Sequence, residues 1–266
     1  MKPISAVIIT LNEEDNIGPC IDSLWQVADE IIVLDSFSSD NTVSIAKEKG
    51  AIVKQELFAG YIEQKNHALK LAKYDYVLSL DADEALSSKL ILSILEAKKD
   101  FKFKAYYMNR YNHYCGRFIN HGLWYPDQKV RLFDKRIAKW GGMNPHDKIE
   151  LAKNEMPCFL KGDILHYTFN TIREHQERNE RMSTIAAQSI FESDKKKHWS
   201  KIILSPAWSF INGYFFRLGF LDGHRGFILA IQTANLSFLK YQKLQSLQKQ
   251  HKDLLMTITH NFKSVD

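Results

Sequence analysis

The first hundred residues alternate short apolar runs with longer amphipathic stretches, which is the pattern of a wound α/β domain. We expect buried strands at residues 4–10, 30–34, 51–54 and 76–80. We expect helices at about residues 15–28, 41–50, 61–73 and 88–99. Strands and helices that alternate in this way build a mostly parallel sheet with right-handed crossovers.

The fourth of these strands leads into a cluster of carboxylates, Asp81, Asp83 and Glu84. In open α/β sheets, ligands bind beyond the carboxyl ends of the strands. Because unpaired buried charge is costly, two carboxylates separated by one residue need a partner or water. One interpretation is a Mg²⁺ or Mn²⁺ site shared with a substrate's phosphates. The other is a solvated turn, where Asp is common.

Polar residues also follow the first two strands, and the wound topology brings them to the same edge as the carboxylates. They are Asn12 with Glu13, and Asp35. A dinucleotide site would need Gly-x-Gly-x-x-Gly after the first strand, whereas residues 11–14 contain no glycine. A P-loop is absent as well. We therefore expect a metal clamp on a diphosphate instead of a glycine-rich phosphate cradle.

Residues 101–170 predict further strands joined by long loops. Residues 128–133 alternate polar and apolar side chains, as a half-exposed strand does. The glycine-containing segment Trp140–Lys148 predicts a tight, irregular loop. Asp134 and Glu150 are expected to face solvent.

From Thr171 onward the pattern is helical. Residues 172–193 form a polar helix, followed by the basic segment Lys195–Lys201, an aromatic-rich region at 208–220 and a last helix at about 240–256. Basic residues beside aromatic, amphipathic helices fit an anionic membrane surface. They fit equally a helical cap on the sheet domain. The expected domains are 1–170, with halves 1–100 and 101–170, and a helical extension, 171–266.

Net charge and cysteine content limit the classes of binding partner and the cellular compartment that we expect. The net charge of +5 and a pI of about 8.9 suit nucleotides, phosphates or an anionic membrane surface, and we expect no nucleic acid partner. Three cysteines without paired spacing indicate a reducing compartment and argue against a zinc site. We expect neither a signal peptide nor a membrane-spanning helix. The expected location is the cytoplasm, extending to the inner face of the cytoplasmic membrane if the extension binds lipid.

Three motifs together resemble the signatures of family 2 inverting glycosyltransferases, which have the GT-A fold. They are Thr10-Leu11-Asn12-Glu13-Glu14, the segment Asp35–Thr42, and Leu80-Asp81-Ala82-Asp83-Glu84. The resemblance covers about residues 1–170. The segment after Thr171 is similar to bacterial lipopolysaccharide-core glucosyltransferases.

This resemblance implies a UDP-sugar donor, with glucose as the sugar, and a saccharide acceptor such as a lipopolysaccharide core or another cell-envelope glycan. It also implies Mg²⁺ or Mn²⁺ as cofactor. Asp35 would accept a hydrogen bond from uracil, or it is only a strand-end cap. Asp83 would bind the metal. The remaining donor-side residues implied by the motifs are Thr10, Asn12, Glu13, Asp81 and Ala82.

Other candidates lie outside the three motifs. Lys65 would approach a phosphate, or it is a solvated helix lysine, and Asn66 and Arg131 would contact substrate. His146 and Asp147 match a His–acidic pair of related enzymes, and Asp147 is the expected general base. His166 is either a third metal ligand or a structural histidine.

The base must lie across the sugar from the diphosphate, and therefore outside the metal cluster. The carboxylates that meet this condition are Asp127, Asp134, Asp147, Glu150 and Asp163. Asp147 follows the irregular glycine-containing segment, where functional side chains are common.

Alternative functions remain open at this point. A sugar transferase to a polyprenyl phosphate would need no strong base, because its acceptor is already an anion. A nucleotidylyltransferase is disfavoured by the missing glycine-rich loop. A catalytically silent membrane-surface binding protein is opposed by the presence of both Asp81 and Asp83.

Overall fold

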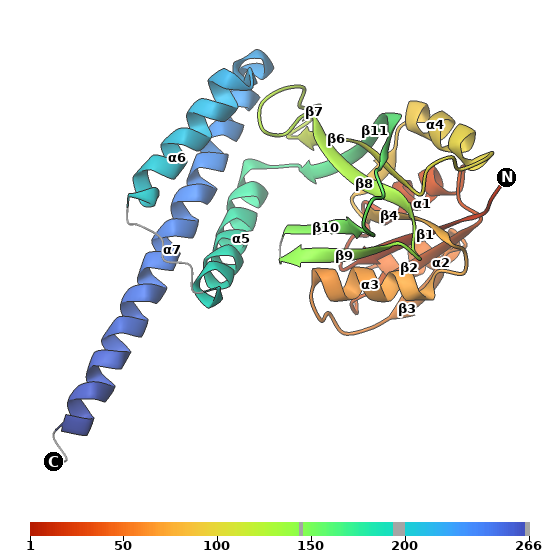
Figure 1. The fold of residues 1–266 in the computed structure, drawn as a ribbon. Helices are drawn as coiled ribbons and strands as arrows, with labels where there is room; N and C mark the ends of the chain where they lie inside the picture. The colour runs from red at the N-terminus through yellow and green to blue at the C-terminus, as the bar shows by residue number, and fades with distance from the viewer. Residues whose placement is uncertain (144–145, 194–199, 264–266) are drawn as a thin grey trace. The chain divides into compact units, whose positions relative to one another are not determined.

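The computed structural model describes residues 1–143, 146–193 and 200–263, with side chains of Met143, His146 and residues 255–263 left outside the description. The contacts of the chain divide it into two compact units (Figure 1). Unit 1 comprises Met1–Asn120 and Trp124–Asn170, and unit 2 comprises His121–Leu123 and Thr171–Asp266.

Unit 1 is built on a nine-stranded sheet with the order β3-β2-β1-β4-β8-β6-β11-β5, and β7 pairs with β6 at the side. The strands β1 (Ile4–Thr10), β2 (Glu30–Asp35), β3 (Ile52–Gln55) and β4 (Tyr76–Asp81) are parallel. The other strands are β5 (Glu84–Leu86), β6 (Ala105–Tyr114), β7 (Arg117–Phe118), β8 (Asp127–Asp134) and β11 (Cys158–Phe169). Because β8 is antiparallel to β4 and β6, the sheet is mixed beyond its parallel half. The predicted wound α/β architecture is confirmed.

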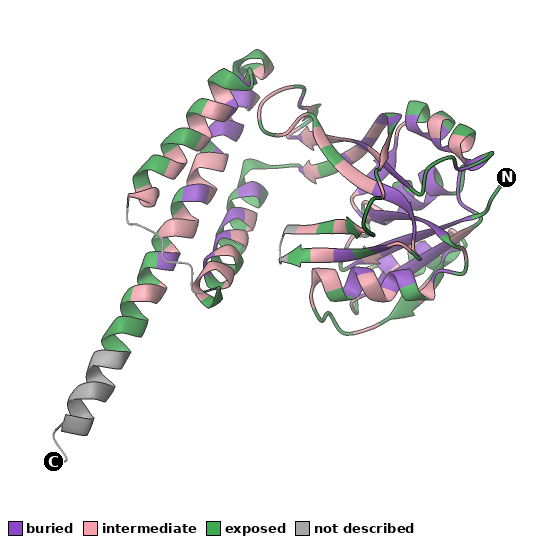
Figure 2. Cartoon of the chain, viewed as in Figure 1, coloured by how far each residue is buried: buried purple, intermediate pink, exposed green. Residues whose placement is uncertain are grey.

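Two apolar cores pack against the two faces of this sheet. Figure 2 marks the buried positions along its strands and helices. On one face, side chains of α1 (Ile17–Leu24), α2 (Thr42–Glu48) and α4 (Ser88–Lys98) pack on alternate residues of β1 and β4. On the other face lie α3 (Tyr61–Leu71) and Trp140. Burial on both faces explains why the parallel strands read as continuous apolar runs.

The expected loop over Trp140–Lys148 is wrong. The strands β9 (Ala138–Met143) and β10 (His146–Leu151) pair antiparallel, and Asp147 lies opposite Gly142. The glycines serve the hairpin itself, since a Cβ on Gly141 would lie 2.4 Å from the Glu150 carboxyl carbon and Gly142 has φ +101°. Trp140, Ile149 and Leu151 pack into the core, so the segment follows strand periodicity.

The sequence also gives no sign of β5, and the expected exposure of Asp134 is wrong. Asp134 is 2% exposed and accepts hydrogen bonds from Arg136 Nε and Nη2 at 2.9 and 2.6 Å. This ion pair with a neighbour two positions along the chain is what permits burial of the carboxylate. Glu150 is exposed, as predicted.

Unit 2 is helical. It contains α5 (Ile172–Glu192), α6 (Lys201–Ile211), the π-helical turn η1 (Asn212–Phe216), the 3₁₀ turn η2 (Gly219–Asp222) and α7 (Gly223–Lys263). Both α5 and α6 pack against α7. Buried Asn179 donates to the Gln232 carbonyl at 3.0 Å, and Lys243 pairs with Glu180 at 2.7 Å, so polar contacts fix the register of α5 on α7.

The expected helix at residues 172–193 is confirmed, and the one at 240–256 is part of the longer α7. Lys195, Lys196 and Lys197 lie outside the described residues. Among the described helices, none has both the length and the apolar character needed to cross a bilayer.

Candidate active site

The carboxyl ends of β1, β2 and β4 lie side by side, as the alternation of strands and helices predicts. Thr10 is in register with Asp35, and Ile9 is in register with Asp81. The strand ends therefore bring the nucleoside-side and metal-side candidates to one edge of the sheet. The loops that follow β1 and β2 are tied together, because the Ser39 N–H donates to Asn12 Oδ1 at 2.8 Å and the Glu13 N–H donates to Thr42 Oγ1 at 2.8 Å.

Asp35 is fully buried at the end of β2. Its carboxylate accepts hydrogen bonds from the Ser38 N–H and from Gln55 Nε2, both at 3.0 Å, and from the Ser38 hydroxyl. It thus has the contacts of a strand-end cap, and its role toward uracil stays a prediction. Thr10 is buried beside it, and the Thr10 hydroxyl oxygen has no hydrogen-bond partner among the described residues. An unpaired buried hydroxyl is unusual in a folded protein and fits a ligand contact.

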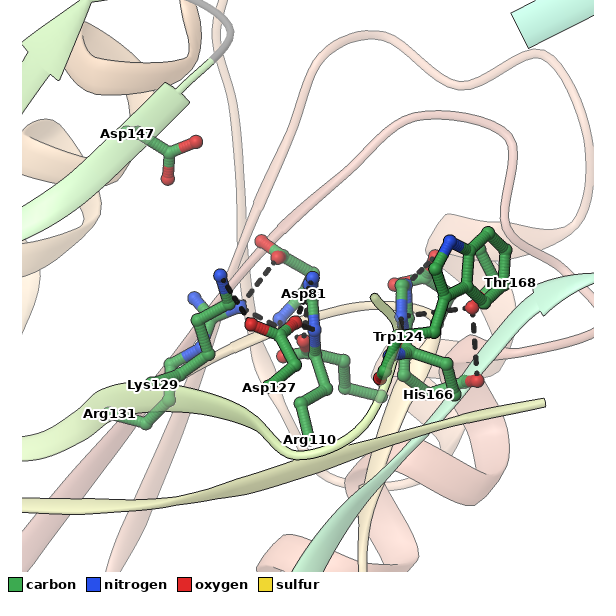
Figure 3. Close-up of polar contacts among 12 residues, drawn as sticks. Asp81, Arg110, Trp124, Asp127, Lys129, Arg131, Asp147, His166 and Thr168 are labelled. Carbon is green, nitrogen blue, oxygen red and sulfur yellow. Dashed lines mark hydrogen bonds and ion pairs between the residues drawn. The ribbon is translucent and has the colours of Figure 1, made fainter. Parts of the chain in front are cut away.

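A continuous chain of ion pairs crosses the site from β10 to β8. Figure 3 shows Asp81, Arg131, Arg110, Asp127 and Lys129 of this chain. We call it the ion-pair chain, and its members in order are Asp147, Lys65, Asp81, Arg131, Glu84, Arg110, Asp127 and Lys129. The N–O distances along it are 2.8, 2.9, 2.9, 2.9, 3.4, 2.7 and 3.0 Å. Opposite charges alternate, so each buried carboxylate has a cationic partner.

Asp81 is held by two cations within this chain. Lys65 Nζ contacts Oδ1 and Arg131 Nη2 contacts Oδ2, both at 2.9 Å. Burial raises the pKa of the Asp81 carboxyl, but the charges of Lys65 and Arg131 outweigh it and hold that pKa well below its ordinary value. Asp81 is therefore a carboxylate at neutral pH.

Within the ion-pair chain, Lys65 connects Asp81 at the end of β4 to Asp147 on the β9–β10 hairpin. It is buried, so the alternative of a solvated helix lysine is wrong. Its ammonium also lies 4.4 Å from the Trp140 ring, within the range of a cation–π contact, and the Arg131 guanidinium lies 5.4 Å from the same ring. Asn66 binds the backbone of Trp140 through its side-chain oxygen and nitrogen, both at 2.9 Å, so its amide positions β9.

Asp83 and His166 form a separate pair at the edge of the sheet. Asp83 Oδ2 lies 3.1 Å from His166 Nε2, although 83 positions separate the two residues. The Asp83 carbonyl accepts from the Tyr167 N–H at 2.9 Å, which fixes the turn between β4 and β5 against β11. Ala82 between the two Asp residues is buried in the core and anchors the same turn.

Neighbouring polar groups fix the orientation of the His166 ring (Figure 3). Asn112 Nδ2 donates to the Trp124 carbonyl at 2.7 Å, so Asn112 presents its oxygen to His166 Nδ1 at 2.6 Å. Because that oxygen can only accept, Nδ1 carries the proton. Nε2 faces the Asp83 carboxylate, which also only accepts, so without a metal ion Nε2 would donate a hydrogen bond to Asp83. A metal ion bound between the two groups would take the place of that hydrogen.

The Asp83–His166 pair fits a divalent cation. Oxygen and imidazole donors suit Mn²⁺, and two adjacent ligands of an octahedral ion at about 2.1 Å lie roughly 3 Å apart, close to the separation of this pair. Within the described part of the chain, no group of three or more His, Cys, Asp and Glu side chains could hold a metal ion.

Sequence reasoning missed several residues of the site. Glu84 belongs to the quoted motif but received no role, and Arg110, Asn112 and Trp140 were not singled out. The one available signal was that Arg110 and Asn112 lie two apart in a predicted strand region and so share a face. The backbone of His146 pairs with Met143, and its side chain lies outside the described residues.

Comparison with known proteins identifies the family. The profile of Glycosyl transferase family 2 matches residues 5–151, which is more than half of the chain. The chain belongs to this family. It is therefore a glycosyltransferase, and its resemblance to the family in the three motifs is confirmed.

Relatives match over nearly the whole chain. A glycosyltransferase of Rickettsia typhi is 30% identical over 96% of this chain and 91% of its own length. The lipopolysaccharide core biosynthesis glycosyltransferase LpsC of Rhizobium meliloti is 28% identical over 91% of this chain and 92% of its own length. Among solved structures, glucosyl-3-phosphoglycerate synthase from Mycobacterium tuberculosis with Mn²⁺ and UDP-glucose covers 42% of this chain and 44% of its own, with 26% identity and a TM-score of 0.36.

Proposed function

We propose that this glycosyltransferase moves glucose from UDP-glucose to a saccharide acceptor of the cell envelope, such as a lipopolysaccharide core, with inversion at the anomeric carbon. The LpsC relative, which matches 91% of this chain, supports the acceptor class. The sequence has three cysteines without paired spacing, which supports a reducing, cytoplasmic compartment. Residues 1–170 are the catalytic domain, with a nucleotide-sugar half (1–100) and an acceptor half (101–170), and residues 171–266 are the helical extension.

The observation that carries this proposal is the Asp83–His166 pair beside Asp81. Asp83 and His166 would hold Mg²⁺ or Mn²⁺, and that ion would stabilise the negative charge on the departing diphosphate. Lys65 and Arg131 supply fixed positive charge at the same edge, because both contact Asp81. Such preorganised charge favours a transition state in which negative charge grows on a phosphate oxygen.

The nucleoside would lie over the ends of β1 and β2. Asp35 would exchange one of its present partners for the uracil N–H, since a carboxylate only accepts hydrogen bonds. The unpaired hydroxyl of Thr10 and the tied loops at Asn12 and Glu13 would line the same pocket.

Asp147 would act as the general base. It takes the proton of the acceptor hydroxyl while that oxygen bonds to the anomeric carbon and the bond to the UDP oxygen breaks. Asp147 lies on β10, outside the Asp83–His166 pair, as the geometry of inversion requires. Asp127 is the alternative base. Burial raises the pKa of its carboxyl, but the charges of Arg110 and Lys129 outweigh this and hold that pKa below its ordinary value.

The test of the proposal is the metal dependence of UDP binding in Asp83→Ala. We expect Mn²⁺ to tighten UDP binding to the wild type and to have no effect on the variant, measured by isothermal titration. Exposed Asp100→Ala is the matched control and should behave as the wild type. If folded Asp83→Ala keeps the Mn²⁺ effect, the assignment of the metal site is wrong. If neither protein responds to any UDP-sugar, the donor class is wrong.

A further inference from the structure

The segment of unit 2 from α6 to the start of α7 exposes an unusually large set of apolar side chains. None of the 11 residues of α6 is buried, although the helix packs on α7 and carries no charge after Lys201 (Figure 2). We call the following exposed residues the apolar face: Ile203, Leu204, Trp208, Ile211, Phe215, Phe216, Leu218, Phe220, Leu221 and Phe227. Phe216 is 68% exposed and Leu204 is 65% exposed. Many large apolar side chains exposed within one short segment indicate an interaction site.

Several of the exposed rings lie in η1, η2 and the first turns of α7, which we call the tip of unit 2. These elements pack closely against one another. Glycines allow η1, η2 and α7 to meet at backbone distance, since a Cβ on Gly219 would lie 2.6 Å from the Gly213 carbonyl oxygen and one on Gly226 would lie 1.8 Å from the Gly219 carbonyl oxygen. Phe210, Tyr214 and Phe227 contact one another at ring-centroid distances of 5.5 to 6.0 Å. The apolar face is therefore presented by a fixed scaffold.

The charges around the apolar face are almost all positive. From residue 201 to 240 the cations are Lys201, Arg217, Arg225 and Lys240, while Asp222 is the one acidic residue. The Asp222 carboxylate is occupied, because it accepts from the His121 N–H at 2.8 Å, and its side chain is 8% exposed. Arg217 is exposed beside Phe216.

We propose that this face lies on an anionic lipid bilayer, with the apolar side chains in the interfacial layer and Lys201 and Arg217 against the lipid phosphates. An amphipathic surface of aromatic and aliphatic residues flanked by cations is how interfacial helices bind membranes. A second copy of the chain fits poorly, because two such faces would bring like charges together without an acidic partner. This proposal goes beyond the proposed function, and it does not depend on the basic segment Lys195–Lys197.

The experiment measures co-sedimentation with vesicles, in the full chain and without any sugar donor. We expect binding to vesicles of phosphatidylglycerol and phosphatidylethanolamine, weaker binding at high salt, and little binding to phosphatidylcholine. The double variant Trp208→Ser/Phe216→Ser should bind at least tenfold more weakly, because each large apolar side chain contributes about that factor. Leu92→Ser, which removes an exposed leucine of unit 1, is the matched control and should bind normally.

Charge is tested separately. Lys201→Gln/Arg217→Gln should weaken binding about 25-fold, since each cation near an anionic surface contributes roughly fivefold. Exposed Arg173→Gln on α5 is the control. In the wild type, fluorescence of Trp208 should shift to the blue on vesicles and be quenched by brominated lipid, and Trp208→Phe should lose that signal.

Three outcomes would overturn the proposal. The wild type could fail to bind anionic vesicles at low salt, or the apolar double variant could bind as the wild type does. The protein could also be a dimer without lipid, by sedimentation velocity, that Trp208→Ser/Phe216→Ser converts to a monomer. Because none of these measurements uses UDP-sugar or metal, failure here leaves the glycosyltransferase assignment untouched, and the reverse also holds.

Discussion

Lys65 Nζ lies 2.8 Å from Asp147 Oδ2, and the same ammonium binds Asp81 at 2.9 Å. One lysine of α3 therefore couples the proposed base to the carboxylate at the end of β4. When a diphosphate competes for this ammonium, Asp147 loses part of its ionic partner. The proposed base and the donor site are linked through a single side chain.

We expect Lys65→Met to weaken UDP-glucose binding about tenfold or more, because it removes a charge-assisted contact and leaves Asp81 with one cation. The folded-state pKa of Asp81 is lowered, so its carboxylate is present above the ordinary value near 3.9 and is lost as pH falls. Without Lys65 that pKa rises, and binding should be lost at a higher pH on the acid side. Titration between pH 4 and 7 measures this, with exposed Lys70→Met on the same helix as control. If UDP-glucose binding is lost at the same pH in Lys65→Met and in the wild type, Lys65 does not set the ionisation of Asp81.

Asp147→Asn should not weaken UDP-glucose binding and should lower turnover by about 10²–10⁴-fold, the usual effect of removing a general base. Asn keeps the shape of the side chain and loses its basicity. Steady-state turnover and donor titration separate the two effects, and Glu150→Gln in the same hairpin is the control. Turnover within a few-fold of the wild type would exclude Asp147. It would favour either Asp127 as base or an anionic acceptor such as a polyprenyl phosphate.

The stability of the helical unit should depend on pH through His175. Burial and then the charge of Arg178 lower the pKa of His175 to about 4, whereas an exposed histidine titrates near 6.5. The unfolded chain binds a proton between these values and the folded chain does not. Stability is therefore complete above about pH 6.5 and falls as pH is lowered.

His175→Gln removes this dependence. Urea unfolding followed by circular dichroism should show the stability advantage of the wild type over His175→Gln shrinking by about 2–3 kcal/mol between pH 7 and 4.5. Exposed His224→Gln should follow the wild type at every pH. Parallel curves for wild type and His175→Gln would contradict the prediction.

Gly226→Ala should destabilise the tip of unit 2 by about 2–3 kcal/mol, because its Cβ would overlap the Gly219 carbonyl oxygen. Gly223→Ala is the matched control. It has nothing within 4 Å of a new Cβ, but its φ of +62° and ψ of −140° lie near a region that is essentially restricted to glycine and cost an alanine about 1–3 kcal/mol. Thermal unfolding should rank wild type above Gly223→Ala and Gly223→Ala above Gly226→Ala. Equal losses would mean that backbone strain, and not the close approach, explains the glycines.

The parallel half of the sheet could be predicted because its signal is local. Both faces of β1, β2 and β4 are buried, so each of these strands is a run of consecutive apolar residues. The parallel topology then brings Thr10, Asp35 and Asp81 together. The segment from β9 to β10 was misjudged because glycine permits both a loop and a strand. Only the Glu150 side chain across Gly141 decides between them.

The ion-pair chain could not be predicted from local pattern. Glu84 is buried in a three-residue strand, and it is stable there because Arg131 and Arg110 arrive from β8 and β6. In the same way, the orientation of the His166 ring depends on Asn112, which is 54 positions away. Contacts between strands that are distant in sequence decide both features, and no spacing along the chain encodes them.

The turn that carries Asp83 lies between two strands of the sheet, β4 before it and β5 after it. The Tyr167 N–H also donates to the Asp83 carbonyl. Although β5 is the last strand in the sheet order, the Leu86 N–H donates to Ser23 Oγ at 3.0 Å, so the amide proton of Leu86 should exchange slowly with solvent, with or without donor. Such a turn has little freedom left to lose when a ligand arrives. A change of sugar preference would then have to come from the loops and the β9–β10 hairpin around it, while this turn stays the same.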